Sequence, residues 1–297
     1  MITLKQIHYA LAVEKTRHFK KAADICHVSQ SALSTAISEM EKQLDIHIFE
    51  RDNKKVFITP IGKQLLQKAH QIKIEVDEFY QLSKTQKKLL SYPLSVGIIP
   101  TIGPFLLPKV LPEVRRQYPY FQIMLEEAQS HVLVNKVKNG DLDTAIIALP
   151  YPTEGLHTFE FLQEDFFLIS HKSDALIQDA EISSHELDKS NLLLLEDGHC
   201  LKDQALAICQ FQKTEIGRSF SGTSLYTLIQ MVCARMGVTF VPKMALDQLL
   251  HDSNELNVAH LNEPGPHRKI AFITRLNYAG VKNIELLIKI FRQQLNQ

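Results

Sequence analysis

Two cysteines, Cys200 and Cys209, have a spacing that could support a reversible chemical switch. An apolar run over residues 192–195 predicts a buried strand, and the Glu-Asp-Gly sequence after it predicts a turn. An amphipathic helix is expected from His199, which puts Cys200 in its first turn. Unpaired amide groups and the positive end of the helix dipole favour a thiolate there. The sequence therefore predicts that Cys200 is reactive.

The predicted helix would hold the two sulfur atoms apart. Nine positions of helix correspond to a rise of about 13 Å and half a turn of rotation, whereas a disulfide needs Cα atoms within about 7 Å. A bond between Cys200 and Cys209 would require the helix to unfold, so that oxidation would change the local fold. The alternative is that Cys200 is an ordinary buried thiol and Cys209 a small core residue, since free cysteines are commonly inert.

Length and composition indicate a multidomain cytoplasmic protein. A chain of 297 residues exceeds one ordinary core, and its 45% hydrophobic and 22% charged residues are typical of soluble globular proteins. Neither a signal-peptide core nor an apolar run long enough to cross a membrane is visible in the sequence. Four cysteines in a chain of this length do not make a disulfide framework. Any disulfide is therefore expected to be conditional.

Residues 1–59 predict a mainly α-helical DNA-binding domain with a helix-turn-helix and a wing. The formal net charge of the chain is zero, but basic side chains are in excess over residues 1–90. The first helix is expected to bury Leu4, Ile7 and Leu11. A second helix and a short turn lead to Ser29, the expected N-cap of a third helix.

The third helix has a short, uncharged polar face of the kind that can approach base edges in the major groove. The residues predicted to face DNA from this helix and its cap are Ser29, Gln30, Ser31, Ser34, Thr35 and Ser38. A predicted basic wing follows, with Arg51, Lys54 and Lys55 placed to hold phosphates. Any one of these residues alone would more simply be a solvated surface residue.

Residues 60–90 predict a long linker helix that dimerises. The Thr59-Pro60 pair predicts an N-cap followed by proline at the first helical position. The apolar residues that then recur at steps of 4, 3, 4 and 3, as in a heptad seam, are Leu65, Ala69, Ile72, Val76 and Phe79. The alternative is a helix that packs only against its own domain.

Residues 91–297 predict an α/β regulatory domain with two lobes. Strands and helices alternate, and the last strand and helix are expected to return to the first lobe. Lobe I is therefore assigned to residues 91–165 and 268–297, and lobe II to residues 166–267. A cleft between such lobes, at the ends of the strands, is where ligands tend to bind.

Three stretches near the N-terminus closely resemble the LysR-type transcriptional regulators. They are FKKAADICHVSQSALS from residue 19, ISEMEKQLDIHIFER from residue 37 and VFITPIG from residue 56. The stretches DLDTAII and GVTFVP resemble the effector-binding part of the same family. The resemblance implies a winged helix-turn-helix, a linker helix and a two-lobed effector domain of the periplasmic-binding-protein type.

Within that family, residues 192–209 are similar to the members that sense hydrogen peroxide, as are GIIPTIGPFLLP and EEAQSH. This similarity implies that Cys200 is the peroxidatic cysteine and Cys209 the resolving one. The residues that it places around a peroxide pocket are Thr101, Ser130, His199, Asp203 and Arg268. Ser130 stands where threonine is usual, and Lys202 where arginine is usual.

The resemblance implies a redox-switched transcriptional regulator with no cofactor or metal and no enzymatic role. The partners that it implies are double-stranded promoter DNA, further copies of the chain in a dimer and then a tetramer, RNA polymerase, and a cellular thiol reductant such as glutaredoxin; no membrane partner is expected. Two alternatives remain open. One is a regulator that senses a metabolite in the interlobe cleft, with incidental thiols, and the other is a thiol peroxidase fused to a DNA-binding domain.

Overall fold

Local capping signals begin the first helices of the N-terminal unit in the computed structural model. Helix α1 (Leu4–Thr16) begins after Thr3, which forms a capping box with Gln6. Helices α2 (Phe19–Ile25) and α3 (Gln30–Leu44) follow, and the Ser29 hydroxyl caps α3 by accepting a hydrogen bond from the Ala32 amide at 3.2 Å. The predicted helix-turn-helix is confirmed.

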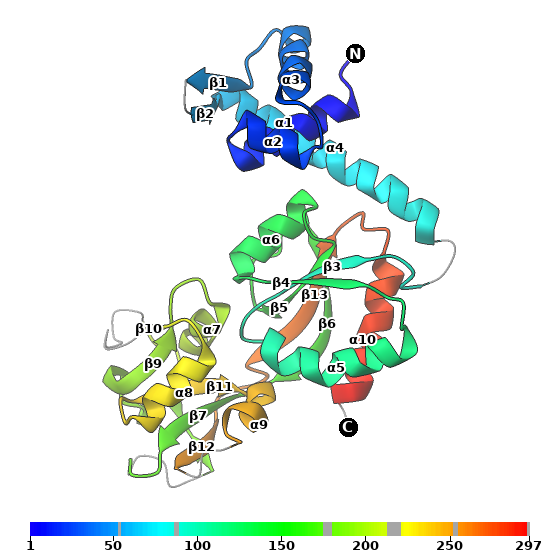
Figure 1. Cartoon of the computed structure of the whole chain (residues 1–297). Coiled ribbons are helices and arrows are strands. Elements are labelled where there is room, and N and C mark those ends of the chain that lie inside the picture. The colour runs from blue at the N-terminus through cyan, green and yellow to red at the C-terminus, as the bar shows by residue number, and fades with distance from the viewer. Residues whose placement is uncertain (53–54, 86–88, 175–179, 213–220, 252–254, 296–297) are drawn as a thin grey trace. The chain divides into compact units, whose positions relative to one another are not determined.

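The structure describes residues 1–52, 55–85, 89–174, 180–212, 221–251 and 255–295, and it forms two compact units, Met1–Gln86 and Lys87–Gln297 (Figure 1). In the first unit, β1 (Phe49–Asp52) and β2 (Lys55–Ile58) pair as an antiparallel hairpin, which is the predicted wing. Helix α4 (Pro60–Thr85) begins where Thr59 Oγ1 accepts a hydrogen bond from the Gly62 amide at 2.9 Å.

The buried face of α1 differs from the predicted one. Leu4 is 56% exposed, because it occupies the first position of the helix, and Ile7 is only half-buried. Gln6 is buried instead, and its side-chain amide donates a hydrogen bond to the Ala36 carbonyl at 3.2 Å. A polar residue can therefore replace an apolar one on a buried face when its donors are satisfied. The spacing of Leu33, Ile37, Met40 and Leu44 predicts the buried face of α3; the first three are buried, and Leu44 is half-buried.

Helix α4 leaves part of its apolar seam exposed within the N-terminal unit. Ala69 is buried, but Ile72 is 41% and Phe79 is 72% exposed. The described part of the helix reaches Thr85, and residues 86–88 lie outside the described residues. The assignment of residues 60–90 to a separate dimerising segment stays a prediction.

Lobe I is built on a five-stranded sheet with the order β4-β3-β5-β13-β6. Its strands are β3 (Leu94–Ile98), β4 (Ile123–Glu127), β5 (Thr144–Leu149), β6 (Leu156–Glu164) and β13 (Arg268–Arg275). Its helices are α5 (Gly103–Gln117), α6 (Ser130–Asn139) and α10 (Val281–Leu295). Strand β3 is parallel to β4 and β5, whereas β13 is antiparallel to β5 and β6. The final segment thus returns to lobe I, as predicted.

Lobe II is built on a six-stranded sheet with the order β10-β9-β11-β7-β12-β8. Its strands are β7 (Phe166–His171), β8 (Glu181–Ile182), β9 (Leu192–Leu195), β10 (Ser221–Gly222), β11 (Val238–Pro242) and β12 (Leu256–Leu261). Its helices are α7 (Cys200–Ile208), α8 (Leu225–Cys233) and α9 (Leu246–Leu249). The sequence also predicts a strand over residues 218–220, which lie outside the described residues.

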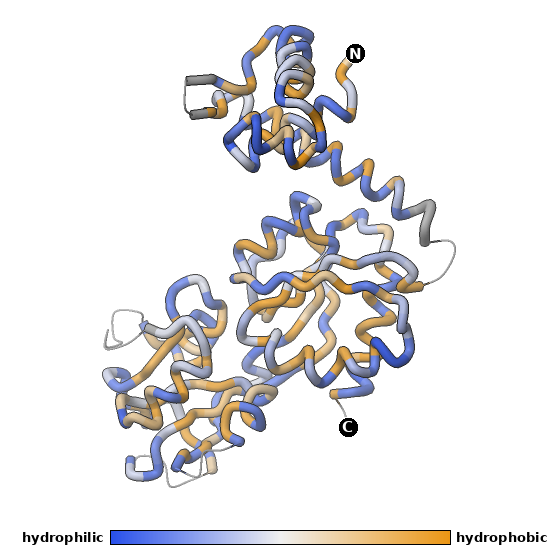
Figure 2. The backbone as a smooth tube through the Cα atoms, viewed as in Figure 1, coloured by the Kyte–Doolittle hydropathy of each residue, from blue (hydrophilic) through white to orange (hydrophobic). Residues whose placement is uncertain are grey.

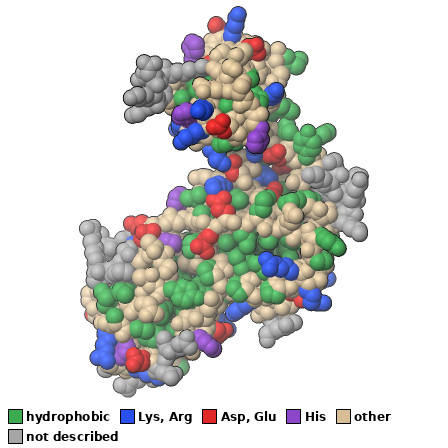
Figure 3. All heavy atoms as spheres, in the orientation of Figure 1, with side chains coloured by type: hydrophobic (Ala, Val, Ile, Leu, Met, Phe, Trp, Pro, Cys, Tyr) green, Lys and Arg blue, Asp and Glu red, His purple; other side chains and the backbone are tan. Residues whose placement is uncertain are grey.

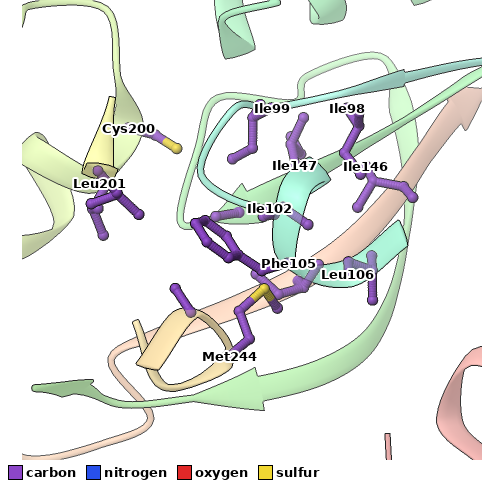
Figure 4. Packing of buried hydrophobic residues seen from close by; sticks show 14 of the residues in the cluster. Ile98, Ile99, Ile102, Phe105, Leu106, Ile146, Ile147, Cys200, Leu201 and Met244 are labelled. Carbon is purple, nitrogen blue, oxygen red and sulfur yellow. The ribbon is translucent and has the colours of Figure 1, made fainter. Parts of the chain in front are cut away.

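The two lobes share one apolar core. Figure 2 shows hydrophobic residues concentrated along the strands of both sheets. A single cluster of buried side chains extends from Ile99 and Ile147 of lobe I to Cys200 and Leu201 of lobe II (Figure 4). Acidic and basic side chains are interspersed over the face of this unit in Figure 3. No helix in the described part of the chain is long and apolar enough to cross a membrane.

Candidate functional site

Cys200 is the first residue of α7 and is only 5% exposed. Its side chain points from lobe II toward Ile99 and Ile147 of lobe I (Figure 4). The turn that leads into the helix requires Gly198, which has φ of +99° and whose added Cβ would lie 2.4 Å from the Gln129 side-chain oxygen. The predicted strand, turn and helix around Cys200 are therefore confirmed.

Ser130 and Arg268 act on the Cys200 thiol from lobe I. Burial raises the pKa of Cys200, while the Ser130 hydroxyl, the Arg268 charge and the Ala148 backbone act in the opposite direction. The expectation of a site that favours the thiolate is thus only partly met, because burial raises the pKa of Cys200 by more than the helix N-terminus and the neighbouring groups lower it. Ser130 is 1% exposed, and within the described chain its hydroxyl has no other hydrogen-bonding partner.

Arg268 is fixed where the chain passes between the lobes. Its Nε donates a hydrogen bond to Glu164 Oε1 at 2.8 Å, and Nη1 and Nη2 donate to the Thr101 hydroxyl and carbonyl, each at 3.2 Å. The guanidinium also lies 6.0 Å from the centre of the Phe166 ring. Glu164 ends β6 and Arg268 begins β13, so these contacts hold the charge beside the junction of the two sheets.

Thr101 is buried and binds Arg268, so its hydroxyl does not cap α5, whose N-cap is Ile102. Ser130, Arg268 and Thr101 together form a buried polar group in lobe I, and the first two lie close enough to Cys200 to shift its pKa. This arrangement can stabilise a thiolate and donate hydrogen bonds to a small polar molecule.

His199 and Asp203 occupy different surroundings from this polar group. His199 is the N-cap residue of α7 and is buried, with Nε2 at 3.9 Å from Glu196 Oε1. Burial lowers the pKa of His199, and the Glu196 carboxylate opposes this shift. Asp203 is exposed on α7, where its charge acts on Tyr151. His199 is therefore buried next to Cys200 in the chain but makes no hydrogen bond or ion pair with Ser130, Thr101 or Arg268 among the described residues, and the Asp203 side chain faces solvent.

Cys209 caps the other end of α7 and is 4% exposed. Burial and the charge of Glu263 raise the pKa of Cys209 to about 12. Both thiols are free. Because α7 stands between them, the two sulfur atoms are held at opposite ends of about 13 Å of helix.

The predicted DNA-facing residues lie at the start and on the outer face of α3. Ser29 caps the helix and its hydroxyl lies 3.0 Å from that of Ser31. Gln30, Ser31, Thr35 and Ser38 are exposed, and Ser34 is half-buried. Lys54 and the side chains of Arg51 and Lys55 lie outside the described residues, although the wing backbone at 51 and 55 is ordered as β1 and β2.

Two residues of the site were not predicted. Glu164 is the buried partner of Arg268, and a buried arginine does imply such a carboxylate. Tyr151 interacts with Cys200 and Asp203 from the segment after β5. No sequence spacing links it to the cysteine helix, because its proximity to that helix depends on how the lobes pack.

Comparison with known proteins agrees with this architecture. Residues 4–63 match the bacterial regulatory helix-turn-helix protein model of the lysR family, and residues 87–296 match the LysR substrate binding domain model. The chain is 35% identical over 292 residues to the HTH-type transcriptional regulator EstR of Acinetobacter baylyi, covering 98% of this chain and 96% of that protein. It is 33% identical over 297 residues to the transcriptional dual regulator OxyR of Escherichia coli, covering 99% and 96% of the two chains.

Solved structures give the same result. A full-length OxyR from Pseudomonas aeruginosa, in which a cysteine is replaced by aspartate, superposes with a TM-score of 0.82 at 31% identity, covering 98% of this chain and 95% of that one. A hydrogen peroxide-bound cysteine mutant of Corynebacterium glutamicum OxyR superposes with a TM-score of 0.66 at 28% identity, covering 100% and 93%. The two matched domains and the full-length relatives establish that this chain belongs to the LysR family of bacterial transcriptional regulators.

Proposed function

We propose that this regulator senses hydrogen peroxide through a reversible disulfide between Cys200 and Cys209 and controls oxidative-stress genes. The observation that carries the proposal is the Cys200 thiol, which is enclosed beside Ser130 and Arg268 at one end of a helix that ends at Cys209. The similarity to proteins named OxyR supports the same sensing chemistry.

The first step is the attack of the Cys200 thiolate on one oxygen of hydrogen peroxide. The O–O bond breaks and an S–O bond forms, so sulfur is oxidised to a sulfenic acid and hydroxide leaves to become water on protonation. The Ser130 hydroxyl and the Arg268 guanidinium stabilise the thiolate, and with the Thr101 hydroxyl they supply donors for the peroxide and the departing hydroxide.

In the second step the Cys209 thiol condenses with the Cys200 sulfenic acid, which forms the disulfide and releases water. The two Cα atoms cannot approach to about 7 Å while α7 is intact. The bond therefore forms only with unfolding of α7, which couples the chemistry to a conformational change. A cellular dithiol reductant such as glutaredoxin restores the two thiols.

The change at α7 reaches DNA through the assembly. In the proposal α4 dimerises through its exposed seam residues Ile72 and Phe79, and dimers pair into a tetramer. Repacking between effector domains then shifts the spacing of the α3 helices in successive major grooves and alters contact with RNA polymerase. The wing binds DNA phosphates beside the α3 helices through Arg51, Lys54 and Lys55. The protein acts in the cytoplasm as a sensor that needs one oxidation per signal, and not as a peroxidase.

One relative favours a second candidate function. The regulator named EstR is 35% identical to this chain, and its name refers to no peroxide. A regulator of this architecture can instead sense a metabolite between the lobes, with both thiols incidental.

A transcription assay on a promoter that the protein binds separates the two candidates. Peroxide sensing predicts that Cys200→Ser abolishes the response to hydrogen peroxide, whereas Cys233→Ser, which alters a half-buried cysteine of α8, leaves it intact. A response to peroxide that persists in Cys200→Ser would contradict the proposal and leave the metabolite sensor.

A further inference from the structure

The segment that follows β5 packs against the face of α7 that carries Cys200. Gln204 Nε2 donates a hydrogen bond to the Pro150 carbonyl at 3.4 Å. Gln204 lies four positions after Cys200, so the two side chains share one face of the helix. The next residue, Tyr151, is half-buried and packs against the apolar cluster that contains Cys200.

The Tyr151 phenol lies near both Cys200 and Asp203. Burial raises the pKa of the Tyr151 phenol, and the nearby charges of Cys200 and Asp203 raise it further. The Cys200 side chain is 5% exposed, whereas Asp203 is exposed on the surface of α7. The half-buried ring is therefore close both to a buried sulfur and to an exposed carboxylate of the same helix.

Lobe I is tightly packed beside the thiol, and the backbone at Tyr151 is restrained. Ser130 and Arg268, which act on the Cys200 thiol from lobe I, are each only 1% exposed. Pro150 and Pro152 flank Tyr151, and each pyrrolidine ring fixes its own φ. The residue before a proline is restricted as well, which leaves Tyr151 few backbone conformations. The backbone that carries the ring is therefore restrained.

We propose that Tyr151 is a lid that sets the size of the peroxide that reaches Cys200, admitting hydrogen peroxide and excluding bulky organic hydroperoxides. The proposal rests on the function proposed above. With either oxidant the thiolate attacks one oxygen, the O–O bond breaks, sulfur becomes a sulfenic acid, and hydroxide or alkoxide leaves and takes a proton. Because the chemistry at sulfur is the same, discrimination between them comes from access.

The test compares oxidation of Cys200 by hydrogen peroxide and by cumene hydroperoxide in the reduced full-length protein, followed by mass spectrometry of the Cys200 peptide. Tyr151→Ala is expected to raise the cumene hydroperoxide rate about tenfold relative to the hydrogen peroxide rate, as for a pocket whose filling side chain is removed. Tyr151→Phe keeps the ring, and Tyr120→Ala alters a tyrosine that is 96% exposed; both should keep the wild-type ratio. An unchanged ratio in folded Tyr151→Ala overturns the lid.

Alkylation in the absence of peroxide separates failure of the lid from failure of the sensor. The lid predicts that Tyr151→Ala accelerates labelling of Cys200 by N-phenylmaleimide more than labelling by the smaller iodoacetamide. If this holds while hydrogen peroxide leaves wild-type Cys200 reduced, access control by Tyr151 stands and the sensing function fails. The other outcome is that hydrogen peroxide oxidises Cys200 while Tyr151→Ala changes neither the ratio of the two peroxide rates nor the ratio of the two labelling rates. In that case the sensing function stands and the lid fails.

Discussion

The Arg268 guanidinium lies 2.8 Å from the Glu164 carboxylate, with exposed side-chain fractions of 0% and 3%. Because the first residue of β13 and the last residue of β6 form this pair, it joins the two passages of the chain between the lobes. The same guanidinium supports the ionised form of Cys200. The electrostatic surroundings of Cys200 and the junction of the lobes thus share one arginine.

Replacement of Glu164 by alanine should destabilise the protein strongly. It leaves the Arg268 charge buried without its carboxylate, which typically costs about 3–5 kcal/mol. Glu160→Ala is the matched control, because its ion pair with Lys269 is about 40% exposed on both sides and should contribute at most about 1 kcal/mol. Urea unfolding monitored by circular dichroism gives both values, and equal losses in the two variants would contradict this account of the junction.

Removal of the Ser130 hydroxyl should make ionisation of Cys200 less favourable. The hydroxyl stabilises the thiolate against burial, so Ser130→Ala raises the pKa of Cys200 further, and Ser130→Thr preserves the effect. The pH dependence of Cys200 alkylation by iodoacetamide should shift to higher pH in the alanine variant alone. A shift to lower pH would mean that the hydroxyl does not stabilise the thiolate.

Alkaline pH should destabilise the folded state through Cys209. The pKa of Cys209 is about 12 in the folded protein against 9.0 for an ordinary thiol. The unfolded chain therefore releases this proton from about pH 9 upward while the folded chain keeps it, and stability is lost as the pH rises between these values. Unfolding free energies at pH 8 and pH 10 should differ more in wild type than in Cys209→Ala. If the unfolding free energy changed equally with pH in wild type and in Cys209→Ala, the raised pKa of Cys209 would be contradicted.

The fold could be predicted from sequence where the pattern is local. The strand at 192–195, the turn at Gly198 and the helix after His199 depend on neighbouring residues, and all three lie where the pattern predicts them. The sequence pattern indicates no strand at the positions of β6 and β12, whose antiparallel partners β13 and β7 lie far away along the chain. Local amide groups predict an ionised Cys200, but the burial that raises its pKa comes from lobe I, where Tyr151 also could not be foreseen.

The α4 seam should hold two copies of the chain together. Phe79 is 72% and Ile72 is 41% exposed in the single chain, and burial of both in a partner's seam would be favourable. Phe79→Glu should shift the protein from dimer toward monomer in analytical ultracentrifugation, while Gln71→Glu, on the same helix but off the seam, should not. Unchanged self-association in Phe79→Glu would place the interface elsewhere.

Hydrogen exchange in α7, measured by mass spectrometry before and after a stoichiometric pulse of hydrogen peroxide, tests the central claim most directly. The account predicts that Cys200 and Cys209 become joined and that the amides of residues 201–208 lose their protection at the same time, with recovery on reduction. Cys209→Ser should form the sulfenic acid while keeping α7 protected. A disulfide that forms with α7 still protected, or a peroxide-treated protein without the Cys200–Cys209 bond, would contradict the proposed switch.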